Sequence, residues 1–369
     1  ADYVPEIKRR LRQRVGDEET DVGVIMGNDM VITSHGFATS YYLKKDSEYY
    51  GEWGCKWKYF RNPSGSYTEV IERPLEDEKK LESYKIPDPY NERRYEPSRR
   101  IIEEYGKDCW IVGAIPCTIF EVSWGLRGLD KFMMDMVSNR DFAHALMDKV
   151  MEFPLAAGKK LIELGVDMLW TGDDVGMQTG MMISLALWRE YFKPRYAKLY
   201  SEFKKLNPTI KIAYHSCGNC EAILDEMYEI GLDVINPIQA SAMNPGYIKK
   251  RYGKKLALWG TLDEQKVLPF GTSDEVKAEV ERLIKNCARG GGFILAPVHN
   301  IQADTSIENI LAFYEAAKEY GQYPMLAALL RLFPDRQFQY PIHELFPPNG
   351  MLFPLLENIF FLYREGELR

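Results

Sequence analysis

Ile210-Lys-Ile-Ala-Tyr214 is a short, largely apolar run, and Val234-Ile-Asn-Pro-Ile238 and Leu256-Ala-Leu-Trp259 repeat the pattern further along the chain. Such runs leave no face for water, which is typical of parallel strands that helices cover on the outside. Amphipathic helical patterns separate the runs, as a β-α-β arrangement requires. The same pattern extends over most of the chain after residue 100, in the runs 110–115, 168–171, 210–214, 234–238, 256–259 and 293–297.

Strand and helix patterns alternate strictly, which predicts an α/β protein with a (β/α)8 TIM barrel. Two of the helices begin with a capping box, at Thr272-Ser-Asp-Glu275 and at Thr305-Ser-Ile-Glu308. A less clear apolar run at 30–33 adds an early strand. The alternative is an open doubly wound sheet, but no glycine-rich dinucleotide turn follows the first strand.

The sequence predicts three regions. Residues 1–99 form an N-terminal elaboration that contains the first barrel elements and a β-hairpin at 51–74. Residues 100–324 form the main barrel. Residues 325–369 are an atypical tail rich in Leu, Phe and Pro, which we expect to pack on the barrel or on the second copy of a homodimer. The hairpin is indicated by alternating apolar residues before a Ser64-Gly65 turn, namely Trp53, Cys55, Trp57 and Tyr59.

Composition excludes several classes of function. The 369 residues carry a net charge of −7, which disfavours nucleic acid as a partner because phosphate contacts need clustered Lys and Arg. No apolar run reaches the ~18 residues of a membrane span. The N-terminus shows no signal-peptide core, and six cysteines in so long a chain are typical of reduced thiols. We therefore expect a cytoplasmic protein.

Polar side chains follow nearly every predicted strand. Because the carboxyl ends of barrel strands surround the active site, these side chains are the candidates for chemistry. The candidate catalytic residues are Asp173, Asp174, His215 and His299. The candidate substrate-binding residues are Glu121, Gln178, Gln239, Asp263 and Asn300.

His215-Ser-Cys217 is the most specific cluster, because imidazole and thiolate two residues apart suit zinc. With His299 they would give three protein ligands and one open position, as catalytic zinc requires. The alternative is a structural histidine beside a buried cysteine. A redox role for Cys217 and Cys220 is less favoured, since Cys220 is expected to begin the next helix.

Asp173 and Asp174 could supply an acid, a base or a cation ligand. Because adjacent carboxylates cannot point the same way, we expect one to line the pocket and the other to cap a helix.

Over about residues 100–324 the chain resembles the uroporphyrinogen decarboxylase superfamily, whose members are (β/α)8 barrels. Several motifs carry the resemblance together: Thr171-Gly-Asp-Asp-Val-Gly-Met-Gln178, Tyr214-His-Ser-Cys-Gly-Asn219, Asp233-Val-Ile-Asn-Pro-Ile-Gln239, Trp259-Gly-Thr-Leu-Asp263, Leu268-Pro-Phe-Gly-Thr272 and Gly290-Gly-Gly-Phe-Ile-Leu-Ala-Pro-Val-His-Asn300.

The resemblance implies one of two activities. True decarboxylases bind an acidic tetrapyrrole with an arginine-rich N-terminal loop, whereas residues 27–36 contain no arginine to pair with carboxylates. The second branch holds cobalamin-dependent methyltransferases, including methylcobamide:coenzyme M methyltransferases. Their zinc is bound by a His-x-Cys pair, which matches His215 and Cys217, and by a later cysteine, where this chain has His299.

The sequence therefore predicts a corrinoid-dependent methyltransferase that works with a partner corrinoid protein carrying cobalamin. It would use zinc and move a methyl group to or from a small acceptor, either a thiol or tetrahydrofolate. One alternative is a tetrapyrrole decarboxylase. Another is a corrinoid- or porphyrin-binding protein without catalysis, which the presence of His215 and Cys217 disfavours.

Overall fold

A sheet of seven parallel strands forms the centre of the described part of the chain, which in this computed structural model comprises residues 3–17, 20–35, 47–62 and 65–322. The tail predicted at 325–369 lies outside these residues. The strands are hydrogen bonded in the order β1 (Met30–Ser34), β5 (Trp110–Ile115), β6 (Met168–Gly172), β9 (Lys211–His215), β10 (Val234–Asn236), β11 (Ala257–Trp259) and β12 (Phe293–Ile294).

The strand order distinguishes the two architectures that the sequence left open. A doubly wound sheet reverses its order at a switch point, whereas barrel strands follow the chain. Here the order follows the chain from β1 to β12 without reversal. The predicted α/β barrel class is therefore confirmed, and the described residues form a curled parallel sheet of seven strands.

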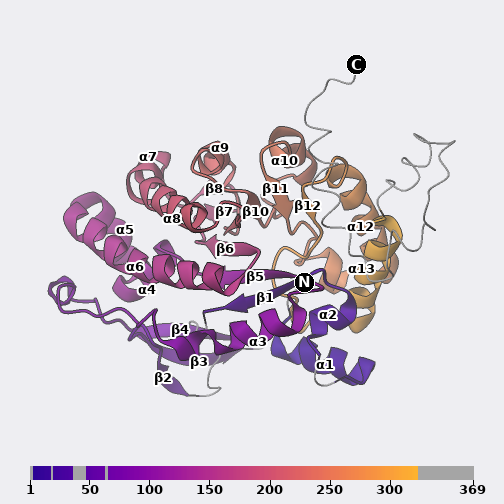
Figure 1. Cartoon of the computed structure of the whole chain (residues 1–369), viewed down its shortest axis with the longest axis horizontal. Coiled ribbons are helices and arrows are strands. Elements are labelled where there is room, and N and C mark those ends of the chain that lie inside the picture. The colour runs from indigo at the N-terminus through magenta and orange to yellow at the C-terminus, as the bar shows by residue number, and fades with distance from the viewer. Residues whose placement is uncertain (1–2, 18–19, 36–46, 63–64, 323–369) are drawn as a thin grey trace. The chain divides into compact units, whose positions relative to one another are not determined.

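Helices flank the sheet, and Figure 1 shows α8, α10, α12 and α13 in an arc around the strands. The α-helices are α1 (Pro5–Val15), α2 (Val22–Met26), α3 (Glu96–Tyr105), α4 (Phe120–Arg127), α5 (Leu129–Ser138), α6 (Arg140–Leu164), α7 (Leu185–Leu187), α8 (Lys193–Leu206), α9 (Leu224–Glu229), α10 (Pro245–Tyr252), α11 (Val267–Phe270), α12 (Ser273–Cys287) and α13 (Ile307–Tyr320). A π-helical turn, Trp188–Phe192, joins α7 to α8.

The capping boxes explain where two of these helices begin. At α12 the Thr272 hydroxyl accepts a hydrogen bond from the Glu275 N–H, and the Glu275 carboxylate accepts one from the Thr272 N–H, as predicted. The second box was placed one residue too early. The hydroxyl of Ser306, not that of Thr305, accepts the Asn309 N–H at 3.1 Å, and α13 begins at Ile307.

The core lies between the strands and the helices outside them. Ile115, Leu169 and Ile212 are fully or almost fully buried and pack with the inner faces of α6 and α8. Burial of such side chains is worth roughly 1.5–3 kcal/mol each, which fixes the register of the sheet and hence the positions of the strand ends.

Two small antiparallel sheets decorate the barrel. The first contains β2 (Glu48–Tyr50), β3 (Lys56–Asn62) and β4 (Gly65–Glu72), in the segment where the sequence predicts a hairpin. The turn at 63–64 lies outside the described residues. The second is the hairpin β7 (Gly176–Met177) and β8 (Gly180–Met181), which follows β6.

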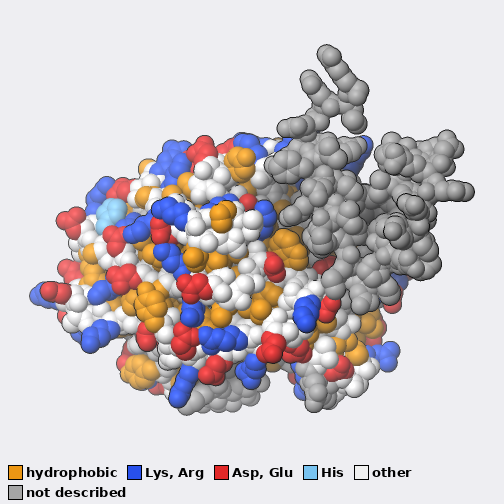
Figure 2. Space-filling model, in the orientation of Figure 1, with side chains coloured by type: hydrophobic (Ala, Val, Ile, Leu, Met, Phe, Trp, Pro, Cys, Tyr) orange, Lys and Arg blue, Asp and Glu red, His pale blue; other side chains and the backbone are white. Residues whose placement is uncertain are grey.

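On the face seen in Figure 2, Lys and Arg side chains alternate with Asp and Glu side chains, and apolar groups lie between them. That face carries no extended basic stripe of the kind that nucleic acid requires. Among the described helices, none is long and apolar enough to cross a membrane.

Candidate metal centre

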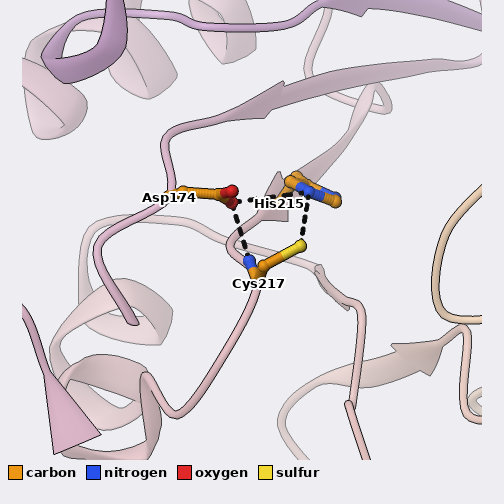
Figure 3. A group of neighbouring side chains, drawn as sticks. All are labelled: Asp174, His215 and Cys217. Carbon is orange, nitrogen blue, oxygen red and sulfur yellow. Dashed lines mark hydrogen bonds and ion pairs between the residues drawn. The ribbon is translucent and has the colours of Figure 1, made fainter. Parts of the chain in front are cut away.

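Three potential metal ligands meet at the carboxyl ends of β6 and β9. Atoms of Asp174, His215 and Cys217 that could bind a cation all lie within 4.8 Å of one another. Figure 3 shows the three side chains turned toward a common point. The His215 Nε2 lies 3.5 Å from the Cys217 Sγ and 3.6 Å from the Asp174 Oδ1. Ligands placed ~2.0–2.3 Å from a tetrahedral zinc are themselves roughly 3.3–3.6 Å apart, so this donor set fits the ion.

The backbone brings the two loops together. Gly172 of β6 is paired with His215 of β9, and the loops that follow are joined where the Asn219 N–H donates to the Met177 carbonyl at 2.7 Å. Gly218 has φ +77°, and a Cβ there would lie 2.6 Å from the Gly176 carbonyl carbon. Only glycine fits so close a crossing, and the crossing holds Cys217 beside the end of β6.

Asn236, at the end of β10, sets the tautomer of His215. Its Nδ2 donates to the Trp259 carbonyl at 3.2 Å, which leaves Oδ1 facing His215 Nδ1 at 2.7 Å and Trp170 Nε1 at 3.1 Å. Because Oδ1 only accepts, Nδ1 carries the proton and the Nε2 lone pair points toward Cys217 and Asp174. Metal-bound histidines are oriented by this kind of outer hydrogen bond. Trp170 also packs edge-on against the ring, with centroids 5.2 Å apart.

The protonation states also suit a cation. Burial lowers the pKa of His215, which favours the neutral ring that binds metals. Burial, followed by the charge of Asp174, raises the pKa of Cys217 to about 12. The thiol therefore keeps its proton until a cation stabilises the thiolate.

Asp173 and Asp174 differ in environment, although they are adjacent in sequence. Asp173 is fully buried and accepts hydrogen bonds from the Ile119 and Glu121 N–H groups and from the Tyr196 hydroxyl. It thus holds the start of α4, which precedes it in the chain, and does not cap a following helix. Asp174 turns the other way and accepts the Cys217 N–H at 2.8 Å.

Three of the predicted substrate-binding residues lie around this centre. Glu121 accepts the Asp174 N–H at 3.3 Å, and burial, followed by Asp173 and Asp174, raises the pKa of Glu121 to about 8. Gln239 accepts the Gly218 N–H at 2.9 Å, so it supports the same loop. Gln178 is exposed and is connected to Gln239 through the Ser241 hydroxyl.

His299, Asn300 and Asp263 lie differently from what the sequence suggested. The run at 293–297 is a strand only at Phe293–Ile294, and the chain beyond it bonds to Leu262 through Ala296 and Val298. His299 is consequently exposed beyond the end of β11. It is close enough for its charge to lower the pKa of His215, but among the described residues the group within 4.8 Å contains Asp174 in its place. Asn300 is also exposed, and the Asp263 carboxylate accepts the Lys266 and Val267 N–H groups where α11 begins.

Sequence reasoning missed Asn236 and Trp170. Asn236 lies inside the quoted motif Asp233-Val-Ile-Asn-Pro-Ile-Gln239, where a polar residue at the end of an otherwise apolar run was the available signal. Trp170 carries no such signal, since an aromatic side chain in a strand is ordinary.

Residues 54–320 match the uroporphyrinogen decarboxylase (URO-D) family, and the chain belongs to it. A methylcobamide:CoM methyltransferase of Methanosarcina barkeri is 26% identical over 218 residues, which are 59% of this chain and 60% of that protein. The chain therefore spans less than two thirds of that protein's length. A uroporphyrinogen decarboxylase of Pelodictyon phaeoclathratiforme is 26% identical over 180 residues, 48% of this chain and 49% of that protein.

Among solved structures, a methyltransferase from Methanosarcina mazei superimposes with a TM-score of 0.60 at 24% identity, covering 73% of this chain and 77% of that one. At this level of identity the likeness establishes the fold and agrees with the barrel described above.

Proposed function

We propose that this protein is a corrinoid-dependent methyltransferase that moves a methyl group between a partner corrinoid protein and a small acceptor. The observation that carries the proposal is the convergence of Asp174, His215 and Cys217 at the barrel mouth. Similarity to a methylcobamide:CoM methyltransferase supports methyl transfer as the type of reaction.

Zinc is the metal that this mixed donor set suits, since it accepts nitrogen, sulfur and carboxylate oxygen in one tetrahedral site. When bound, it would supply the positive charge that lowers the pKa of an acceptor thiol. Asp174, His215 and Cys217 would hold it, with Asn236 keeping the His215 Nε2 lone pair available. Three protein ligands leave one position for the acceptor. Tetrahydrofolate is the alternative acceptor.

Decarboxylation of a tetrapyrrole is the second activity in the family, and the sequence argues against it. Its substrate carries several carboxylates, which need guanidinium partners. Residues 27–36 contain no arginine, and the three residues that meet at the barrel mouth include a carboxylate and no cation. Turnover of uroporphyrinogen should therefore be absent.

The test combines metal analysis with methyl transfer. Full-length protein is dialysed against zinc, its bound metal is measured, and demethylation of methylcobalamin is followed by absorbance with a thiol or with tetrahydrofolate. We expect one zinc per chain, and loss of both zinc and turnover in Cys217→Ser. The matched control is Cys109→Ser, because Cys109 precedes β5 at the opposite end of the strands. Absence of zinc and of transfer to either acceptor, or conversion of uroporphyrinogen to coproporphyrinogen, would refute the proposal.

A further inference from the structure

Three fully buried tyrosines pack together between α8 and the carboxyl ends of β6 and β9. Tyr196 and Tyr200 lie one turn apart on α8 and therefore share a face of that helix. The Tyr196 ring meets the rings of Tyr200 and of Tyr214, from β9, at centroid distances of 5.6 and 5.2 Å. The Tyr200 hydroxyl is hydrogen bonded to the Thr171 hydroxyl of β6 at 3.0 Å. The cluster thus joins the helix to two adjacent strands, just before the chain reaches the candidate metal ligands.

The other two hydroxyls bond to Asp173, the residue before the candidate metal ligand Asp174. The Tyr196 hydroxyl donates to the Asp173 carboxylate, and the Tyr214 hydroxyl donates to the Asp173 carbonyl at 3.2 Å. Phenylalanine would fill the same space without requiring buried partners, so these hydroxyls indicate a role besides packing. We propose that Tyr196 and Tyr214 are positioning residues, which act through Asp173 to direct the Asp174 carboxylate toward the metal centre. The assignment rests on the proposed function, because it concerns the same centre.

Asp173 is held by hydrogen bonds at its backbone and at its side chain. Besides the two phenols, its carboxylate accepts the Ile119 N–H at 3.0 Å and the Glu121 N–H at 3.0 Å, where α4 begins. Its own N–H donates to the His215 carbonyl at 3.0 Å. A rotation of the Asp173 backbone would therefore break several buried hydrogen bonds at once, which fixes the direction in which the chain continues.

A closed ring of hydrogen bonds carries this geometry on to Asp174. The Glu121 N–H donates to Asp173, and the Glu121 carboxylate accepts the Asp174 N–H at 3.3 Å. The Asp174 Oδ1 then accepts the Cys217 N–H at 2.8 Å and lies 3.6 Å from the His215 Nε2, as Figure 3 shows. Because the Asp174 side chain is 42% exposed, packing alone does not hold it. Its direction depends on the backbone that Asp173 fixes.

A matched tyrosine separates this role from a purely structural one. Tyr191 is also fully buried, and its hydroxyl donates to the Met136 carbonyl of α5 at 2.8 Å. Tyr191→Phe therefore removes one buried phenol hydrogen bond that leads to α5 and not to the end of β6. If the hydroxyls only stabilised the fold, Tyr196→Phe and Tyr191→Phe would behave alike at the metal centre.

The first readout uses Co²⁺ as the probe of the metal centre in the full-length protein. The visible absorption of bound Co²⁺ depends on the geometry of its ligands, which global stability does not alter. We expect Tyr196→Phe to keep the thiolate absorption from Cys217 and to lose visible intensity. Its Co²⁺ affinity should fall by about three- to tenfold, less than the roughly 10–100-fold for a direct outer-shell partner, because Tyr196 acts one step further out. Tyr191→Phe should match the unaltered protein in both.

The second readout needs no metal. Hydrogen exchange of the Cys217 amide, which donates to Asp174, is measured in the metal-free protein by NMR. We expect exchange to be at least about fivefold faster in Tyr196→Phe than in Tyr191→Phe, because the acceptor is no longer held in place. If Tyr196→Phe does not fold by circular dichroism, Tyr214→Phe tests the assignment with the same two readouts.

Equal Co²⁺ affinity, Co²⁺ absorption and Cys217 amide exchange in the folded Tyr196→Phe and Tyr191→Phe proteins would overturn the assignment. If the unaltered protein binds no Co²⁺, the metal centre and with it the proposed function are refuted, and amide exchange alone decides the role of the tyrosines. Faster exchange in Tyr196→Phe would then support their positioning of Asp174, and unchanged exchange would refute it.

Discussion

Replacing Asn236 with alanine tests whether the hydrogen bond behind His215 prepares the ring for a metal. The Asn236 Oδ1 accepts from two donors, His215 Nδ1 and Trp170 Nε1, at 2.7 and 3.1 Å. The substitution removes this acceptor and leaves both N–H groups without it in a largely buried place. The imidazole can then carry its proton on either nitrogen and rotate away from Cys217.

The structure sets the size of the expected losses in stability and in zinc affinity. Removing the acceptor of a buried donor costs roughly 1–3 kcal/mol, so two partly buried donors predict a loss of about 2–4 kcal/mol in the free energy of unfolding. Loss of an outer-shell partner of a metal-bound histidine lowers affinity by roughly 10–100-fold. We therefore expect Asn236→Ala to be folded but less stable, and to bind zinc about tenfold or more weakly.

Zinc affinity is measured by competition with a chromophoric chelator, and stability by urea denaturation of the metal-free protein. Asn309→Ala is the matched control. Asn309 is also buried, and its Nδ2 donates to the Leu268 and Gly271 carbonyls, far along the chain from the candidate metal ligands. It should lose comparable stability and keep its zinc affinity. Equal zinc affinity in Asn236→Ala and the unaltered protein would refute the role given to the Asn236 Oδ1.

Three further outcomes are expected. Asp174→Asn should weaken zinc binding by about tenfold with little change in thermal stability, whereas Asp173→Asn should cost about 1–3 kcal/mol of stability, as denaturation will show. Gly218→Ala should destabilise more than Gly290→Ala, because both have positive φ but only Gly218 would meet backbone; equal urea midpoints would contradict this. Burial raises the pKa of Glu264 to about 8, so its contribution to stability is complete below about pH 4.5 and is lost as pH rises through about 8. The melting temperature of Glu264→Gln relative to the unaltered protein should therefore rise with pH, and a constant difference would count against that pKa.

The fold was predictable because the apolar runs of the longer strands are long enough to be recognised. The runs at 110–115, 168–171 and 210–214 correspond to β5, β6 and β9 within a residue at each end. For the last run, at 293–297, the predicted strand end was wrong, since β12 contains only Phe293–Ile294 and the apolar residues after it belong to a loop. An apolar run indicates that its residues are buried, but it does not by itself indicate that they are hydrogen bonded to a neighbouring strand.

The site was predictable only in part, because the position of each site residue depends on where its strand ends. His215 ends β9 and Cys217 follows it, the sequence locates that strand end to within one residue, and the structure places the two side chains together. His299 follows the run whose end was misjudged, and the ring lies exposed. Which of Asp173 and Asp174 faces the centre depends on the residue at which β6 stops, because side chains alternate along a strand. A shift of one residue would exchange their roles.

The three candidate metal ligands follow two adjacent strands, with only 43 positions between Asp174 and Cys217 along the chain. A metal site that required His299 could not form before the final strand of the sheet had been synthesised. Because proteins fold from the N-terminus as they are synthesised, the pair β6 and β9 can form while β12 is still to be made. A cation captured at that stage would favour the nascent half of the barrel over its unfolded alternatives, so the ion would act as an assembly aid before it acts in chemistry.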